Sequence, residues 1–230
     1  MIDTLEWHEK FEALDPWFTR FEINGESFGG GNSYEQDPRV GLFFEWLGQP
    51  ETILELSSFE GGHSVRLAAP PFVERLLGLE GRAENIQRAE LVIQLLGCQN
   101  IEFCHADLDN DSTSLEQFGR FNAVFCAGLL YHLTHPWRLL EKIADVTDHL
   151  FLDTQVSATG DVTVEGYVGS MYSEGGYSDP LSGLSASSFW MTLSCLEDTL
   201  NNLGFEVRQK IAIPDWEGRG PRVHLAASKE

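Results

Sequence analysis

Basic residues are scarce in this sequence. Lys and Arg together number 15, against 36 Asp and Glu, so the formal net charge is −21 over 230 residues. A surface with this excess of negative charge repels the phosphates of nucleic acids and of anionic membranes. No basic cluster offsets it, since the longest grouping, over residues 219–222, holds only two arginines. Nucleic acid and membrane surfaces are therefore disfavoured as partners.

Cysteines and long apolar runs are also few. The four cysteines, at positions 98, 104, 126 and 195, form no CxxC pair, and the histidines at 63, 105 and 135 lack metal-ligand spacing. No apolar run approaches membrane-spanning length, and the first residues, MIDTLEWHEKFEALDPWF, lack the basic and apolar segments of a signal peptide. We therefore expect reduced thiols, no metal and a cytoplasmic location.

The pattern of apolar residues predicts one α/β domain. Apolar runs of strand length alternate with helical spacings between residues 51 and 156, and this alternation indicates crossover connections and a parallel sheet. A further helix and two strands joined without a helix follow, so these last strands should pair antiparallel. The fold class is a Rossmann-like, seven-stranded, mostly parallel sheet with helices on both faces and a C-terminal antiparallel hairpin. The expected strands cover residues 53–56, 73–79, 101–104, 121–127, 149–156, 205–213 and 222–228, and the helices 62–69, 82–96, 136–146 and 189–203.

Two segments fall outside this alternation. Residues 1–50 read as a helical, lid-like extension, with a flexible loop at the glycine run 29–31 and a helix over 38–47 that Asp37 caps. Residues 157–188 read as a loop without Lys or Arg, inserted into the main domain over residues 51–230. A loop this long in a compact domain is either functional or disordered, and its tyrosines favour a function over the active site.

Acidic and glycine-rich segments follow the predicted strands. Ligands of open parallel sheets bind beyond the carboxyl ends of the strands, where the strand order reverses. Glu55 with the loop 57–62, Glu80, the pair Ala106 and Asp107, and the segment 127–132 should therefore converge on one crevice.

The chemistry of these groups suits a nucleoside that carries a positive charge. Glu80 can accept hydrogen bonds from both ribose hydroxyls, Asp107 can accept from an exocyclic amine, and Glu55 can face a cation. Pyrophosphate fits poorly, because Glu55 and Glu60 flank the loop where it would lie.

These motifs resemble those of the class I S-adenosylmethionine-dependent methyltransferases. The matching parts are ILELSSFEGG at the first loop, GLEGR after the second strand, HADL after the third and FNAVFCAGLLYHLTHP at the fourth, over roughly residues 40–156. GLLYHL is similar to a subgroup that includes small-molecule methyltransferases and enzymes that modify the tRNA wobble uridine. The first motif departs from the family pattern, because Ser57 and Phe59 stand where glycine is usual.

The resemblance implies a role for individual residues. Glu55 and the backbone from Ser57 to Gly61 would hold the methionine portion of the cofactor, and the backbone of Ala127 and Gly128 would lie near its amine. The ribose and adenine would contact Glu80, Gly81, Arg82, Ala106 and Asp107. Tyr131 and His132 would border the transferable methyl group.

His132 is the candidate general base, because histidine titrates near neutral pH; a structural histidine at a strand end is equally consistent with this position. Aromatic residues could wall the acceptor pocket, or could serve ordinary lid packing. They are Tyr34, Tyr172, Tyr177, Trp190 and Trp216.

The sequence therefore predicts a methyltransferase that acts on an O, N or S nucleophile of a small molecule. Three alternatives stay open: a tRNA-modifying methyltransferase, an NAD-dependent dehydrogenase on the same fold, and a cofactor-binding protein without turnover. The oligomeric state, monomer or homodimer, is not readable from the sequence.

Overall fold

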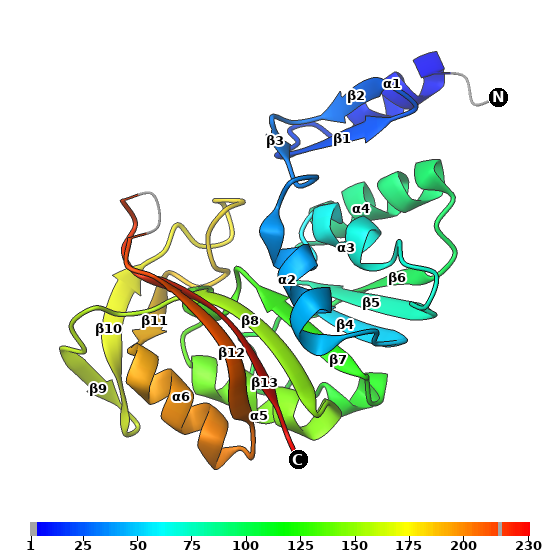
Figure 1. Cartoon of the computed structure of the whole chain (residues 1–230). Coiled ribbons are helices and arrows are strands. Elements are labelled where there is room, and N and C mark those ends of the chain that lie inside the picture. Colours follow the sequence, from blue (N-terminus) through cyan, green and yellow to red (C-terminus); the bar gives the residue numbers. More distant parts are fainter. Residues whose placement is uncertain (1–3, 216–217) are drawn as a thin grey trace.

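A seven-stranded sheet forms the centre of the protein. The computed structural model describes residues 4–215 and 218–230, and it orders the sheet β12-β13-β8-β7-β4-β5-β6 (Figure 1). Strands β4 to β8 are mutually parallel, whereas β13 runs antiparallel to both β8 and β12. This confirms the predicted fold class. The strands are β4 (Thr52–Leu56), β5 (Arg75–Glu80), β6 (Ile101–His105), β7 (Ala123–Ala127), β8 (His149–Gln155), β12 (Glu206–Ile213) and β13 (Arg222–Ser228).

Helices cover both faces of this sheet. Helices α2 (Pro38–Leu47), α3 (Gly62–Leu67) and α4 (Ala83–Leu96) pack on one face, and α5 (Pro136–Val146) and α6 (Leu193–Asn202) on the other. Strand β4 shows why, since Ile53 joins the core under α2 while Leu54 and Leu56 join the core under α5. Asp37 caps α2 as expected, accepting a hydrogen bond from the backbone N–H of Arg39.

The N-terminal extension is only partly helical, so the helical conformation expected before the glycine run is wrong for residues 19–28. After α1 (Thr4–Glu12), the strands β1 (Thr19–Ile23), β2 (Glu26–Gly29) and β3 (Asn32–Ser33) form a small sheet (Figure 1). Asn24 and Gly25 both adopt positive φ, as a tight hairpin turn requires, and β1 alternates buried and exposed side chains.

Two glycines of the run lie close to the backbone of residues 17–19. A Cβ on Gly29 would lie 2.4 Å from the backbone oxygen of Thr19, and one on Gly30 would lie 2.4 Å from that of Trp17. Only glycine permits this close approach of one chain segment to another. The extension packs against α4 through a cluster of buried apolar residues, which comprises Trp7, Phe11, Trp17, Phe21, Ile23, Phe28, Leu91, Val92 and Leu95.

The insert is a second small sheet, so the expectation of a structureless loop over 157–188 is also wrong. Strands β9 (Val162–Val164), β10 (Tyr167–Ser173) and β11 (Ser187–Met191) are antiparallel in the order β11-β10-β9 (Figure 1). Strand β11 includes Phe189, where a helix was expected. That helix, α6, begins only at Leu193, because Thr192 caps it. Residues 175–186, in the connection from β10 to β11, form what we call the covering segment.

Two short 3-10 turns complete the fold, η1 (Glu116–Phe118) and η2 (Leu130–His132). Among the described residues, no helix is both long and apolar enough to cross a membrane.

Candidate active site

The loop after β4 holds a glycine-like backbone without the usual glycines. Ser57 and Phe59 have φ values of 63° and 52°, in the left-handed region, and Gly61 follows at 82°. The backbone N–H groups of Ser57 and Ser58 both donate to the carbonyl oxygen of Leu79, at 2.8 and 3.0 Å. These hydrogen bonds hold the loop against the end of β5. They support a backbone conformation that residues other than glycine rarely adopt.

Glu80 ends β5 and connects the two predicted motifs. Its carboxylate accepts hydrogen bonds from the backbone N–H groups of Phe59 and Arg82, each at 2.9 Å, and from the amide of Asn85 at 3.3 Å. Glu80 is 3% exposed, and burial raises the pKa of its carboxyl although these hydrogen bonds oppose the shift. The hydrogen bonds fix the carboxylate at the edge of a cavity.

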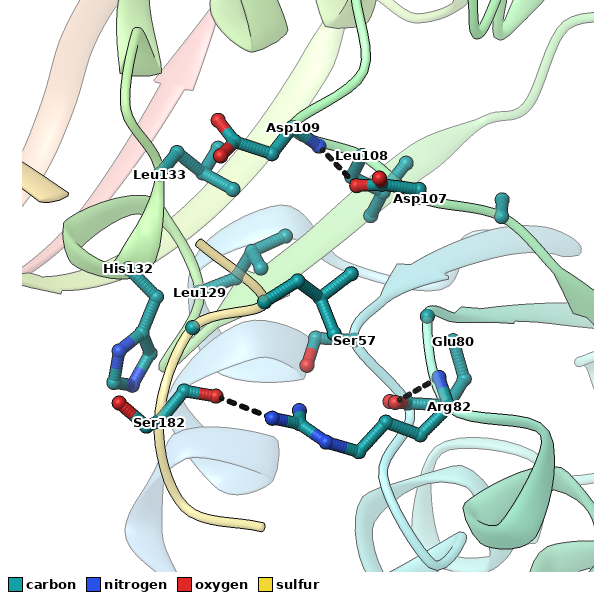
Figure 2. A pocket seen from close by; sticks show the side chains of 14 residues that line it. Ser57, Glu80, Arg82, Asp107, Leu108, Asp109, Leu129, His132, Leu133 and Ser182 are labelled. Carbon is teal, nitrogen blue, oxygen red and sulfur yellow. Dashed lines mark hydrogen bonds between the residues drawn. The ribbon is translucent and has the colours of Figure 1, made fainter. Parts of the chain in front are cut away.

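A cavity that is partly open to solvent lies beside Glu80 (Figure 2). Its lining comes from five separate segments: the loop after β4, the end of β5, the loop after β6, the turn after β7 and the covering segment. Leucines form its apolar walls, and Asp107 and Asp109 supply hydrogen-bond acceptors. The lining residues are Ser57, Glu80, Gly81, Arg82, Ala106, Asp107, Leu108, Asp109, Leu129, His132, Leu133, Ser182, Gly183 and Leu184.

Arg82 fastens the covering segment over this cavity. Its guanidinium donates to the carbonyl oxygen of Ser182 at 3.0 Å (Figure 2). It also donates to that of Asp179 at 2.9 Å, and more weakly to those of Gly176 and Tyr177. Leu184 lies directly over Gly81, where a Cβ would come within 2.7 Å of it. The covering segment therefore forms one wall of the cavity.

A second, larger cavity adjoins the first and is also partly open to solvent. The two share Ser57, Glu80, Arg82, His132 and Ser182. Among the described residues, the second is lined by four arginines but by only one carboxylate, that of Glu80, which contrasts with the acidic composition of the whole chain. Its other walls include Phe18, Tyr34, Phe59, His63, Ala127, Gly128, Tyr131, Pro180 and Leu181.

Two of these arginines share one buried carboxylate. Asp153 of β8 is 0% exposed and accepts from Arg39 Nη1 at 2.9 Å and from Arg222 Nε and Nη2 at 2.6 Å each. His224 lies 2.9 Å from the same carboxylate. Burial raises the pKa of Asp153, but the hydrogen bonds from Arg222 and His224 and the positive charges outweigh it, so the pKa lies well below its usual range. Both guanidinium groups are thus held in place at the cavity wall.

His132 stands where the two cavities meet. It ends η2, and its Nδ1 lies 3.0 Å from a carboxylate oxygen of Glu174. Tyr131, next to it, lines the larger cavity, with its ring centroid 5.3 Å from the guanidinium carbon of Arg222. Burial raises the pKa of the Tyr131 hydroxyl, so this group stays a neutral hydrogen-bond donor at ordinary pH.

Most of the predicted site residues come together. The residues that line one or both cavities are Tyr34, Ser57, Glu80, Gly81, Ala106, Asp107, Ala127, Tyr131 and His132.

Two residues of the first motif do not line either cavity. Glu55 lies behind the loop, 1% exposed, because alternation along β4 points its side chain toward α3, where its Oε2 accepts from Ser64 Oγ at 2.5 Å. Direct contact between Glu55 and a cation therefore stays a prediction, which this side-chain position does not favour. Burial raises the pKa of Glu55 to about 8. Gly61 packs instead against α4, where an added Cβ would lie 3.2 Å from that of Ala89.

Three of the aromatic residues also lie outside the cavities. Trp190 meets Tyr131 edge-on, with ring centroids 5.9 Å apart, and Tyr172 stacks on Trp190 at 4.6 Å. These two extend the wall behind Tyr131. Tyr177 lies on the outer side of the covering segment and donates to Glu84 at 3.0 Å. Trp216 lies outside the described residues.

Sequence reasoning missed several residues that line the cavities or support that lining. Arg222 and His224 could have been found, since they interrupt an apolar run at a spacing of two, which places both on one face of a strand. Glu174 is the only acidic residue between Glu165 and Asp179, but nothing local in the sequence connects it to His132. Arg39 likewise gave no signal, because its partner Asp153 is 114 positions away.

Comparison with known proteins identifies the family. No protein-family model matches the chain, and a search among curated proteins found no relative. Among solved structures, the N-terminal domain of EvdMO1, in the presence of S-adenosylhomocysteine and D-fucose, has a TM-score of 0.87 and 32% sequence identity, covering 100% of this chain and 98% of that one.

Longer and more distant structures are also similar. Full-length EvdMO1 gives a TM-score of 0.74 at 29% identity over 99% of this chain and 48% of that chain, so this chain spans about half of it. Magnesium protoporphyrin IX methyltransferase (ChlM) from Synechocystis PCC 6803 with bound S-adenosylhomocysteine gives 0.60 at 14% identity, over 84% and 81% of the two chains, which shows a shared fold.

The chain therefore belongs to the class I S-adenosylmethionine-dependent methyltransferases, and S-adenosylmethionine is its cofactor. Its own residues fit that molecule. A buried carboxylate stands at the end of the second strand of the motif, an apolar cavity with acidic hydrogen-bond acceptors adjoins it, and arginines line the cavity beyond. The dehydrogenase alternative loses its support, since the N-terminal domain of EvdMO1, at 32% identity, was also solved with S-adenosylhomocysteine bound.

Proposed function

We propose that this enzyme methylates a hydroxyl oxygen of a small, sugar-like molecule and that His132 is the general base. The observation that carries the proposal is the place of His132, at the junction of the two cavities, with Nδ1 paired to Glu174. Its Nε2 has no hydrogen-bond partner among the described residues. That nitrogen is therefore available to a substrate.

The two cavities would bind different parts of the cofactor and the methyl acceptor. The smaller cavity would take the adenosine portion, with Glu80 accepting from the ribose hydroxyls and Asp107 from the adenine amine. The 57–61 loop and the backbone of Ala127 and Gly128 would border the methionine portion, whose carboxylate the arginines of the larger cavity can attract. Glu55 would contribute indirectly, by supporting the loop through Ser64.

Bound S-adenosylmethionine supplies an electrophilic methyl group on a positively charged sulfur. A neutral hydroxyl is a weak nucleophile, so a base that removes its proton as the new O–C bond forms accelerates the transfer. Nε2 of His132 would accept that proton. Tyr131 and the covering segment would align the acceptor and exclude water, which matters because an in-line displacement depends on alignment.

A sugar-like acceptor is supported by the EvdMO1 comparison, whose N-terminal domain was solved in the presence of D-fucose. Free D-fucose offers hydroxyl groups as nucleophiles and no amine or thiol. Trp190 and Tyr172, behind Tyr131, are aromatic surfaces that could extend the acceptor site outward. The extension over residues 1–50 and the insert would act as lids, since Phe18, Tyr34 and residues 180–182 line the larger cavity.

The test is transfer of labelled methyl from S-adenosylmethionine into a cell extract separated into small-molecule and RNA fractions. We expect label in small molecules, in a form stable to alkali as a methyl ether is, and at least a tenfold lower rate with His132→Ala. Label in the RNA fraction would instead favour a tRNA-modifying enzyme, the alternative that the GLLYHL resemblance allows. Equal rates for the variant and the wild type would remove His132 as the base.

A further inference from the structure

Glu174 occupies an unusual position for an acidic residue. It follows β10 directly, and its side chain is only 3% exposed although both of its neighbours in sequence are exposed. A buried carboxylate is costly unless hydrogen bonds satisfy it. The donors that satisfy this one come from three different parts of the protein.

The first donor is the ring of His132, whose Nδ1 lies 3.0 Å from Oε2 and 3.1 Å from Oε1. Burial raises the pKa of the Glu174 carboxyl, but the hydrogen bonds from His132, Ser182 and Gly183 outweigh this effect and lower the pKa to about 2. The carboxylate is therefore ionised at neutral pH and can only accept. Nδ1 must carry the proton, which leaves the lone pair of neutral His132 on Nε2.

The other donors belong to the covering segment and to β11. Gly183 N–H donates to Glu174 Oε2 at 2.9 Å, the Ser182 hydroxyl donates to the same oxygen, and the Ser188 hydroxyl donates to Oε1 at 2.7 Å. Residues 182–184 also line the smaller cavity. One carboxylate thus holds both the wall of the cofactor cavity and the ring at the junction of the two cavities.

Close packing strengthens this connection. A Cβ on Gly183 would lie 2.5 Å from the backbone oxygen of His132, so the covering segment sits directly against the histidine backbone. In Figure 2, Ser182 lies beside the His132 ring and opposite Arg82. Arg82 fastens the cofactor side of the segment and Glu174 fastens the catalytic side.

We propose that Glu174 is a positioning residue which fixes the Nδ1–H tautomer of His132 only while the covering segment is closed over the cofactor cavity. If the segment opens, Glu174 loses two of its donors and the ring loses its fixed partner. His132 would then have its Nε2 lone pair directed for proton transfer only in the closed state. The closed covering segment would also keep water from the reacting groups. This role rests on the function proposed above, because the tautomer matters to turnover only if His132 is the base.

The test compares Glu174→Gln with Glu84→Gln. The second variant makes the same chemical change at an acid that also contacts the covering segment, through the Tyr177 hydroxyl, but does not touch His132. Two measurements do not depend on turnover. The ring ¹⁵N shifts of His132 in labelled protein report which nitrogen carries the proton, and hydrogen–deuterium exchange reports opening of residues 175–186.

For Glu174→Gln we expect a mixture of tautomers, about tenfold faster exchange in residues 175–186, and a kcat lowered about 100-fold. Glu84→Gln should match the wild type in ring shifts and kcat. If Glu174→Gln does not fold, Ser182→Ala removes one donor of the covering segment and should shift both readouts in the same direction. A single Nδ1–H tautomer or unchanged exchange in the variant overturns the proposal.

Failure of the proposed function would look different. If His132→Ala retains full activity, the general-base role is lost, but the tautomer and exchange measurements still decide whether Glu174 links the ring to the covering segment.

Discussion

The backbone N–H of Phe59 donates a 2.9 Å hydrogen bond to the carboxylate of Glu80. These residues belong to two separate sequence motifs, and the bond makes them one structural unit. The loop after β4 cannot move without disturbing the acid at the end of β5. The residue expected to bind the ribose therefore also shapes the loop expected to border the methionine portion.

Glu80→Gln should weaken binding of S-adenosylhomocysteine by about 100-fold. Glutamine has the size of glutamate but lacks the charge that strengthens hydrogen bonds from the ribose hydroxyls, and loss of about 3 kcal/mol corresponds to that factor. Calorimetric titration gives the affinity, and circular dichroism confirms the fold. Glu84→Gln, four positions later on the exposed side of α4, should bind within twofold of the wild type. Equal affinities for both variants would place the ribose elsewhere.

Ser57→Gly should leave the protein as stable as the wild type or stabilise it by up to about 1 kcal/mol. The φ of 63° strains serine but not glycine, and this relief offsets the greater freedom of glycine in the unfolded chain. Ser58→Gly is the matched control, since Ser58 is not among the residues with positive φ. Chemical denaturation should show that it is destabilised by about 1 kcal/mol. The reverse ranking would show that the left-handed backbone at Ser57 carries no strain.

Glu55→Gln should change how stability depends on pH. The folded-state pKa of about 8 lies above the ordinary 4.5, so the native state holds its proton more tightly than the unfolded chain does. Stability of the wild type should then fall as pH rises from about 4.5 to 8, by roughly 4 kcal/mol at most. Thermal unfolding without cofactor should show a flatter profile for Glu55→Gln and a higher Tm than the wild type above pH 8.

The control for that experiment is Glu51→Gln, an exposed acid one residue before the same strand. It should keep the wild-type dependence on pH. If Glu55→Gln also keeps it, Glu55 is ionised in the folded protein and the raised pKa is wrong.

Asp153→Asn should destabilise the protein by about 3–5 kcal/mol, because it leaves Arg39 and Arg222 without their shared buried charge. Asp148→Asn breaks an ion pair to Arg120 whose side chains are 55% and 58% exposed, and should cost less than about 1 kcal/mol. Urea denaturation at pH 7 measures both. Similar costs for the two variants would contradict the buried network.

The pH dependence of Asp153 has the opposite sign to that of Glu55. Its folded-state pKa is depressed, so its contribution is present above its unfolded value of 3.8 and is lost as pH falls through the folded value. The difference between wild type and Asp153→Asn should therefore be constant from pH 5 to 8.

The amino-acid sequence alone determined the central sheet and the cofactor edge of the site. Apolar runs of strand length alternating with helical spacing leave few arrangements other than a parallel sheet, and Glu80, Asp107 and His132 follow strands whose carboxyl ends must meet at one edge. The small sheets over residues 19–33 and 162–191 were missed, although Asn24-Gly25 and Glu165-Gly166 were available as local turn signals.

Only the tertiary structure decided which side chains face one another across the site. Glu174 meets His132 from 42 positions away, and Asp153 meets Arg222 from 69 positions away. It also turned Glu55 away from the cavity, since side-chain direction depends on which face of β4 the helices cover. Hydrophobic spacing specifies the face that a residue belongs to, but a buried charge finds its partner through the packing of whole elements, and no local pattern records that choice.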